Sequence, residues 1–210
     1  LDTLLGFRDD CHDKVGRAMQ YQVKTIFEEF RAREVATMTG VSQELQRNWR
    51  RHGYLPGKEG AGNKRTTARE IALLTLMGIL SESKISVKSA LIYAEHMALP
   101  LELFLDRTPG AFVIEGSELA LESEAEILDQ IARDEPEAPF AFVPLPEPSP
   151  DDPLAGLYFL GSPGDIDQVV GGPDLWAAGL LLDLQGIAKR IAAKAPRPLI
   201  RYNLHPEADA

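Results

Sequence analysis

The segment from Ser42 to Arg51 carries side chains that can bind the edges of DNA bases. Glutamine and arginine can each form two hydrogen bonds with a base edge in the major groove, so a helix that presents several of them is suited to reading DNA. Leu45 and Trp49, four residues apart, predict the buried stripe of such a helix. The opposite face is polar and carries Gln43, Gln46, Arg47 and Arg50, all predicted to bind DNA, of which Gln43, Gln46 and Arg47 are expected to read bases.

The basic loop that follows is suited to the DNA backbone. Its glycines make it flexible enough to form a wing, and its cationic side chains can lie along phosphates. The residues expected to hold the backbone are Lys58, Lys64 and Arg65. The other predicted DNA-binding residues are Arg33, Ser42, Arg51 and Asn63.

A tight turn is predicted between this helix and the one before it. The apolar side chains of residues 33–39 predict a helix, and Gly40 is placed to end it in a left-handed conformation. The hydroxyl of Ser42 is placed to cap the next helix. The sequence therefore predicts a helix-turn-helix, the arrangement that holds a reading helix in many DNA-binding proteins.

Two further helices are predicted after the loop. Thr66 or Thr67 can cap the first of them, and Glu70 completes a capping box with Thr67. This helix is apolar nearly all round, so it must be covered on more than one side. Ser86 is placed to cap the second helix, which is expected to end before Pro100.

The run GVSQELQRNWRRHGYLP, followed by NKR, resembles the winged helix-turn-helix of MerR-type regulators. The resemblance covers about residues 30–97, and its matching positions are Arg47, Trp49, Gly53, Leu55, Pro56 and Arg65. It implies a bacterial, sequence-specific regulator of transcription that binds double-stranded DNA. The second helix would lie in the major groove and the wing on the phosphates.

The mode of dimerisation in that family is not expected here. MerR-type regulators continue into a long helix that pairs as an antiparallel coiled coil, whereas Pro100 and then Pro109 and Gly110 are expected to break this helix. We therefore expect a homodimer that associates through the apolar helix or the C-terminal half. RNA polymerase is a further candidate partner.

Charge is distributed unevenly along the chain. Residues 31–70 hold nine Lys or Arg and four Asp or Glu, whereas residues 101–210 hold seven and 20, and the net charge is −10. This distribution favours local DNA binding and limits non-specific binding elsewhere. In the alternative interpretation, Arg47 and Arg50 belong to a solvated helix face of an all-α core.

Other chemistry finds little support in the sequence. Cys11 is the only cysteine and the four histidines are scattered, so no metal site and no cofactor are expected. Asp165, Asp167, Asp174 and Asp183 lack an acid–base partner and are expected to serve in turns and caps. The protein is therefore not expected to be an enzyme. No apolar run has the length of a membrane span, and we expect a cytoplasmic, nucleoid-associated protein.

The predicted fold class is α+β. An N-terminal helical extension (residues 1–29) precedes an all-α winged helix-turn-helix domain (residues 30–107). A small, acidic α+β domain (residues 108–210), with a Pro-rich loop at residues 136–153, would serve dimerisation or an effector. Its strands are expected at residues 111–114, 118–121, 140–143 and 198–204, and its helices at 123–133 and 185–194. Two further apolar runs lie at residues 155–160 and 176–184.

Two other functions remain open at this point. One is a phage-type or architectural DNA-binding factor, such as an excisionase-like or DNA-packaging protein. The other is a small-molecule-binding protein.

Overall fold

The computed structural model describes residues 11–12, 18–19, 21–55, 66–116, 138–145, 152, 154–170 and 178–206. These residues have a mixed α+β fold, as predicted. The helices are α1 (Ala32–Thr39), α2 (Gln43–Arg51), α3 (Ala68–Glu82), α4 (Val87–Leu105), the 3-10 helix η1 (Pro163–Gln168) and α7 (Leu184–Lys194). The strands are β1 (Cys11–His12), β2 (Ala18–Met19), β3 (Tyr21–Phe27), β4 (Phe112–Glu115), β5 (Phe140–Leu145), β6 (Tyr158–Leu160), β7 (Ala178–Asp183) and β8 (Ile200–Pro206).

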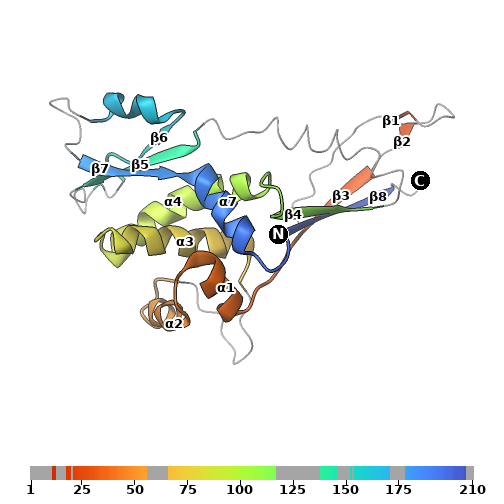
Figure 1. The fold of residues 1–210 in the computed structure, drawn as a ribbon, viewed down its shortest axis with the longest axis horizontal. Helices are drawn as coiled ribbons and strands as arrows, with labels where there is room; N and C mark the ends of the chain where they lie inside the picture. The colour runs from red at the N-terminus through yellow and green to blue at the C-terminus, as the bar shows by residue number, and fades with distance from the viewer. Residues whose placement is uncertain are drawn as a thin grey trace.

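Helices α3 and α4 form the centre of the helical body (Figure 1). Helix α3 begins at a capping box, in which Thr67 and Glu70 exchange side-chain hydrogen bonds with each other's backbone amides. Ser86 caps α4 by accepting from the amide of Ser89 at 3.2 Å. Both predicted caps are confirmed. Helix α3 is covered by α1 and α4, and α7 packs against α1 and α4, so the apolar helix is buried on most sides, as expected.

Helix α4 does not end before Pro100, as the sequence predicted, but continues through it to Leu105. A proline inside a helix costs about 3 kcal/mol. The turn that follows buries Leu101, Phe104 and Leu105, each at most 3% exposed. Full burial of such side chains contributes about 1.5–3 kcal/mol each, which exceeds the cost of the proline.

The sheet β6–β5–β7 lies over the helices on one side (Figure 1). Strand β5 pairs antiparallel with both neighbours, and its residues Ala141 and Val143 face the helical core. The ring of Phe142 lies on the other face in a small cluster with Leu160 and Val169. It packs so closely over Gly179 of β7 that a Cβ atom there would collide with the ring.

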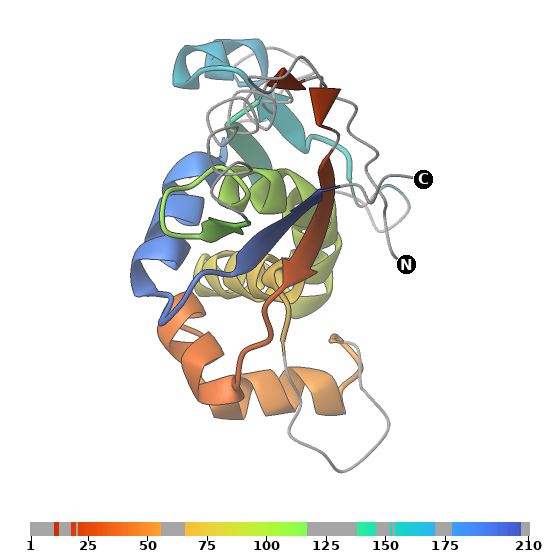
Figure 2. The same ribbon diagram turned by 90° about the vertical axis from the view of Figure 1, so that its right-hand side faces the viewer.

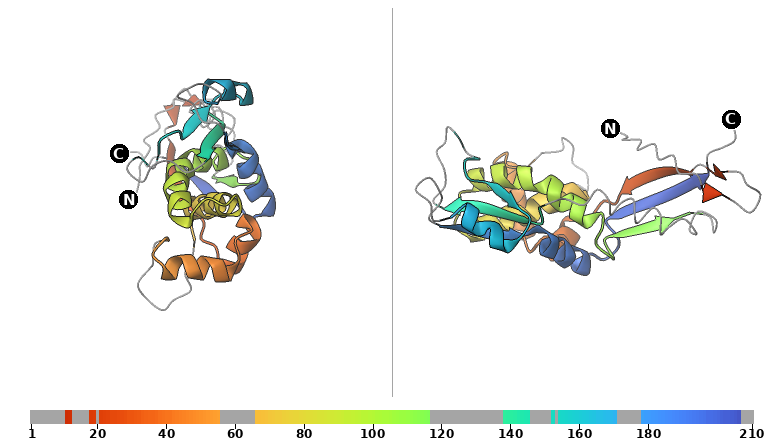
Figure 3. Two further views of the ribbon diagram at one scale, coloured as in Figure 1. Left: turned by 90° about the vertical axis from the view of Figure 1, so that its left-hand side faces the viewer. Right: turned by 90° about the horizontal axis from the view of Figure 1, so that it is seen from above.

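The second sheet, β3–β8–β4, extends away from the helices (Figure 3). Strand β3 pairs antiparallel with β8 from Tyr21 opposite Pro206 to Phe27 opposite Ile200, and β4 lies parallel on the other side of β8. The predicted N-terminal helix is therefore wrong for residues 21–27. Their alternating, β-branched and aromatic side chains suit a strand, and the partner that fixes it lies far away in the sequence. Strands β1 and β2 pair with each other.

The remaining predicted elements correspond to observed ones with shifted ends. The strands expected at residues 111–114, 140–143 and 198–204 are β4, β5 and β8, and the helix at 185–194 is α7. The apolar runs at 155–160 and 176–184 contain β6 and β7. Strand β5 falls inside the predicted Pro-rich loop and includes the buried Pro144. The strand expected at 118–121 and the helix at 123–133 lie outside the described residues.

One cluster of buried side chains extends across the boundary predicted at residues 107/108. It joins Val35 of α1 and Trp49 of α2 with Val143 of β5 and Ile187 of α7. The described parts of both predicted domains therefore share a core.

Candidate nucleic-acid interface

The turn between α1 and α2 is fixed by its own hydrogen bonds and by burial. Gly40 has φ 78°, the left-handed conformation that favours glycine, and its amide donates to the carbonyl of Ala36 at 3.0 Å. Ser42 accepts from the amide of Leu45 at 3.2 Å and so caps α2. Val41, between them, is 4% exposed. The predicted left-handed glycine and the predicted serine cap are therefore both present between α1 and α2.

The buried side of α2 differs from the predicted one. Trp49 is buried, as expected, but its buried neighbour is Gln46, which is 0% exposed, whereas Leu45 is 37% exposed. The amide nitrogen of Gln46 donates to the carbonyls of Val41 at 2.9 Å and Ala32 at 3.4 Å. Gln46 therefore ties α2 to α1 and cannot reach a base, which corrects its prediction as a base-reading residue.

The outward face of α2 is consequently rotated from the predicted face. At 100° per residue, a stripe of Gln46 and Trp49 lies about 50° around the helix from a stripe of Leu45 and Trp49. An open groove runs along the outward face and is lined by Ser42, Glu44, Leu45, Arg47, Asn48 and Arg51. Helix α2 lies at the end of the molecule opposite the β6–β5–β7 sheet (Figure 2).

Most of the described DNA-binding predictions fall on accessible positions. Arg33, Ser42, Arg47 and Arg51 are exposed, and Gln43 is half-buried. The Nε atom of Arg47 donates to the carbonyl of Gln43 at 3.3 Å, so this side chain lies along its own helix. Sequence reasoning missed Glu44 and Asn48. These residues point outward because Gln46 and not Leu45 is buried beside Trp49, which the sequence does not indicate.

Arg50 lies at the flank of α2 rather than on its outward face. Its side chain is half-buried, and its Nε atom has no hydrogen-bond partner among the described residues. Burial lowers the pKa of the guanidinium, and the nearby carboxylate of Glu70, at the start of α3, partly offsets this effect. Arg50 therefore faces the junction between α2 and α3.

The base of the predicted wing is joined by a two-residue bridge. Phe30 and Thr66 exchange two backbone hydrogen bonds of 3.0 Å, and both residues are buried. The bridge therefore holds the segment that leads into α1 next to the segment that leads into α3. The predicted wing residues Lys58, Asn63, Lys64 and Arg65 lie outside the described part of the chain.

The turn between α1 and α2 approaches α3 closely. A Cβ atom placed on Gly78 of α3 would lie 2.8 Å from Cγ2 of Val41. Carbon atoms in contact normally stay about 3.5–4.0 Å apart. The absence of a side chain at Gly78 therefore allows Val41 to dock directly on the helix backbone.

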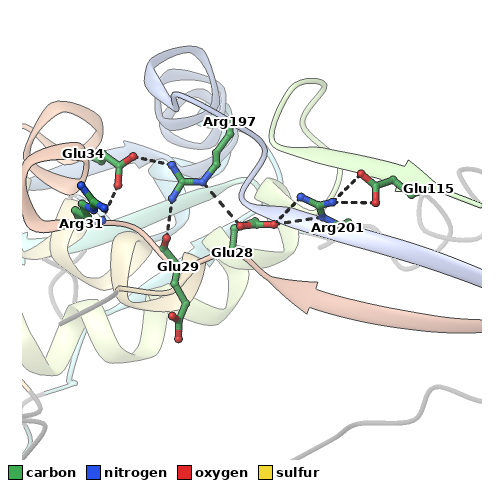
Figure 4. A network of polar contacts seen from close by, with 7 residues as sticks. All are labelled: Glu28, Glu29, Arg31, Glu34, Glu115, Arg197 and Arg201. Carbon is green, nitrogen blue, oxygen red and sulfur yellow. Dashed lines mark hydrogen bonds and ion pairs between the residues drawn. The ribbon is translucent and has the colours of Figure 1, made fainter. Parts of the chain in front are cut away.

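An ionic network joins the start of α1 to the segment between α7 and β8 (Figure 4). The guanidinium of Arg197 binds the Glu34 carboxylate at 2.6 Å and donates to the carbonyl of Glu29 at 2.7 Å. It also lies 4.3 Å from the centre of the Phe30 ring, a cation–π distance. The hydrogen bond from Arg197, followed by that from the Arg31 amide, lowers the pKa of Glu34.

A second arginine extends this network along the β3–β8–β4 sheet (Figure 4). Arg201 of β8 binds Glu28 at 2.9 Å and Glu115 at 2.8 Å, and Glu28 also lies 3.8 Å from Arg197. Arg201 thus connects β8 with β4 and with the end of β3, and Arg197, just before β8, connects the same end of β3 with α1. Sequence reasoning gave neither arginine a role, since their partners are distant in the sequence.

A buried carboxyl group lies where α4 ends. Burial, together with the nearby charge of Glu102, raises the pKa of Asp106 to about 7, although Arg107 acts in the opposite direction. Burial also raises the pKa of Glu102, an effect that Arg69 partly offsets. The pKa of Tyr202 on β8 is raised by burial and then by the Asp106 charge. None of these residues lines the groove on the outward face of α2.

Other sites are not apparent among the described residues. They contain no group of three His, Cys, Asp or Glu side chains placed to hold a metal ion, and no described helix is both long and apolar enough to cross a membrane. Two of the four aspartates have the predicted structural roles. Asp183 caps α7 by accepting from the amide of Gly186 at 2.7 Å, and Asp165 accepts from the amide of Ser162 at 2.8 Å. Asp174 lies outside the described residues.

Comparison of the chain with models of known protein families and with curated proteins gave no match. Function must therefore be inferred from the residues and their geometry.

Proposed function

We propose that the chain is a sequence-specific, DNA-binding regulator of transcription of the MerR type, with α2 in the major groove of double-stranded DNA. The observation that carries the proposal is the outward face of α2, where Arg47, Asn48 and Arg51 line one open groove at an end of the molecule (Figure 2). Exposed cations and amides on a capped helix are the groups that bind base edges and phosphates.

The way in which α2 is held supports this function. The buried side chains of Trp49 and Gln46 fix the inner face of α2, and Val41 docks on α3. A surface that is already ordered loses little conformational entropy when it binds.

The local charge supports it as well. Residues 31–55 include five arginines and two glutamates, and Arg197 already engages one of these, Glu34. In the proposal, Arg33, Ser42 and Gln43 accompany the outward face. Lys58, Asn63, Lys64 and Arg65 hold the phosphates from the loop that follows the helix-turn-helix.

One reading helix contacts few base pairs, so we propose that a homodimer binds two half-sites. As a regulator, the protein would act at the nucleoid in the cytoplasm, with RNA polymerase as a candidate partner. Footprinting on genomic fragments should then show paired, spaced half-sites near promoters. Repeated protected sites elsewhere would favour an architectural or packaging factor.

The experiment that tests DNA binding compares two double variants by fluorescence anisotropy over a range of salt concentrations. Arg47→Ala with Arg51→Ala removes two charges from the outward face of α2. Lys189→Ala with Arg190→Ala removes two exposed charges from α7. The first variant should bind duplex DNA more weakly and reduce the salt slope by up to about 1.8, whereas the second should change neither. Equal effects of both variants would contradict the proposal.

A further inference from the structure

We propose that Asn48 and Glu44 determine the base specificity of α2, Asn48 by binding an adenine and Glu44 by accepting from the amino group of a cytosine. This inference rests on the proposed function and names the feature of DNA that the site recognises. It shifts base recognition from the glutamines of α2 to two residues on its outward face.

The positions of these residues on the helix are the first step of the argument. Around the axis, the buried pair Gln46 and Trp49 lies about 180° from the middle of the face formed by Glu44, Arg47, Asn48 and Arg51. All four of these side chains are exposed and line the same groove. A helix held in the major groove by this face brings Glu44 and Asn48 to the bases, while Gln46 remains buried.

The chemistry of Asn48 fits one base. A carboxamide forms two hydrogen bonds with the major-groove edge of adenine alone among the bases. Its amino group donates to N7, and its oxygen accepts from the N6 amino group. The Asn48 side chain makes no hydrogen bond among the described residues, and it is short, so binding a base orders few rotatable bonds. The longer Arg47 and Arg51 can instead reach the phosphates on either side.

The carboxylate of Glu44 lowers the affinity for DNA in general but adds specificity for one base. A negative charge at a surface that approaches phosphates weakens binding to every sequence, yet it can accept a hydrogen bond from the N4 amino group of cytosine. The described residues contain no partner within ion-pair distance of Glu44 that would neutralise it. Glu44 therefore disfavours DNA that offers no cytosine at the correct position.

The spacing of the two residues limits where the bases lie. Residues four apart are separated by about 6 Å along a helix, and successive bases in one strand by about 3.4 Å. When α2 lies along the groove, the adenine and the cytosine should therefore fall within about two base steps of each other.

The test is selection from a pool of duplexes with a randomised segment, followed by sequencing, with the full chain and its variants. Asn48→Ala and Glu44→Ala are compared with Gln185→Ala on α7 and Glu82→Ala on α3, which remove an exposed amide and an exposed carboxylate elsewhere. All four positions are exposed, so the variants should remain folded, which circular dichroism verifies.

The wild-type chain and both controls should enrich a motif that contains the adenine and the cytosine. Asn48→Ala should lose roughly 5- to 150-fold discrimination at the adenine alone. Glu44→Ala should lose the preference for cytosine and bind random duplexes about fivefold more tightly, the factor for one repulsive charge contact at about 4 Å in water.

Three results would overturn the inference, and the third is distinguishable from the other two. If the wild-type chain selects a motif that both variants keep, or if Asn48→Ala weakens all sequences equally, base specificity lies elsewhere on the DNA-binding surface. If the wild-type chain enriches no duplex, the proposed function fails together with the inference.

Discussion

Substitution of Gly78 by alanine tests whether the turn of the helix-turn-helix docks on the backbone of α3. In a helix interior, alanine is favoured over glycine by about 1 kcal/mol. Here the new Cβ atom would lie 2.8 Å from Cγ2 of Val41, and overpacking of a core costs about 1–3 kcal/mol. We therefore expect Gly78→Ala to lower the free energy of unfolding by about 1 kcal/mol, in spite of its higher helix propensity.

Removal of the opposing methyl groups should reverse the sign of this effect. Val41→Ala alone should cost about 2 kcal/mol, because it leaves a cavity. In that background, Gly78→Ala should stabilise by about 1–2 kcal/mol, because the new methyl group fills part of the cavity and the helix propensity improves. The coupling energy in the double-mutant cycle is then about 2–3 kcal/mol.

Urea unfolding of the four proteins in the cycle, followed by circular dichroism, measures this coupling. Val35→Ala provides the matched control, because Val35 is also a fully buried valine of the helix-turn-helix but does not lie within 4 Å of the Cβ position at Gly78. Additive effects of Gly78→Ala and Val41→Ala, within about 0.5 kcal/mol, would refute the close approach.

Three further predictions concern single residues. Because the pKa of Asp106 is raised to about 7, its folded form holds a proton that the unfolded form releases near pH 4. The free energy of unfolding should therefore fall by on the order of 2–4 kcal/mol between pH 4 and pH 7. In Asp106→Asn the free energy of unfolding should depend less on pH. An unchanged pH dependence in urea titrations of this variant would contradict the raised pKa of Asp106. Lys84 has φ 71° in the turn after α3, a conformation that favours glycine. Lys84→Gly should therefore raise the free energy of unfolding by about 0.5–1 kcal/mol, measured by thermal unfolding. If Lys84→Ala stabilises the protein equally, removal of the charge and not the backbone conformation is responsible. Arg197→Ala should cost about 1–2 kcal/mol and raise the pKa of Glu34, since it removes the ion pair that lowers this pKa; an unchanged Glu34 titration by NMR would show that the pair does not persist in solution.

Structural features that depend on residues close together in the sequence were predicted correctly. Ser42, Thr67 and Ser86 cap helices where expected, and Gly40 has the expected left-handed conformation. These features depend on bonds between neighbours, so the sequence alone specifies them. The same holds for the helix 185–194, whose cap and apolar spacing are local.

Features that depend on distant contacts were predicted poorly. Leu45 and Gln46 both lie next to Trp49 on α2, and the contact with α1 decides that the polar Gln46 is buried, because two backbone carbonyls accept its amide protons. Residues 21–27 could be a helix or a strand by their spacing, and β8 decides in favour of the strand. Arg197 and Arg201 have no neighbouring acids in the sequence, so their network could not be anticipated.

The pairing of β3 with β8 has a consequence for synthesis of the protein. Glu28 and Arg201, which bind each other beside this pair, are 173 positions apart. While the ribosome is still translating the middle of the chain, β3 has no strand to join, α1 lacks the arginine that holds its first turn, and α7 cannot yet cover α1 and α4. Such long-range contacts also form slowly, because a large loop must close first. A nascent or prematurely terminated chain that already contains all of α2 but lacks α7 and β8 should therefore not yet hold α2 as the folded chain does.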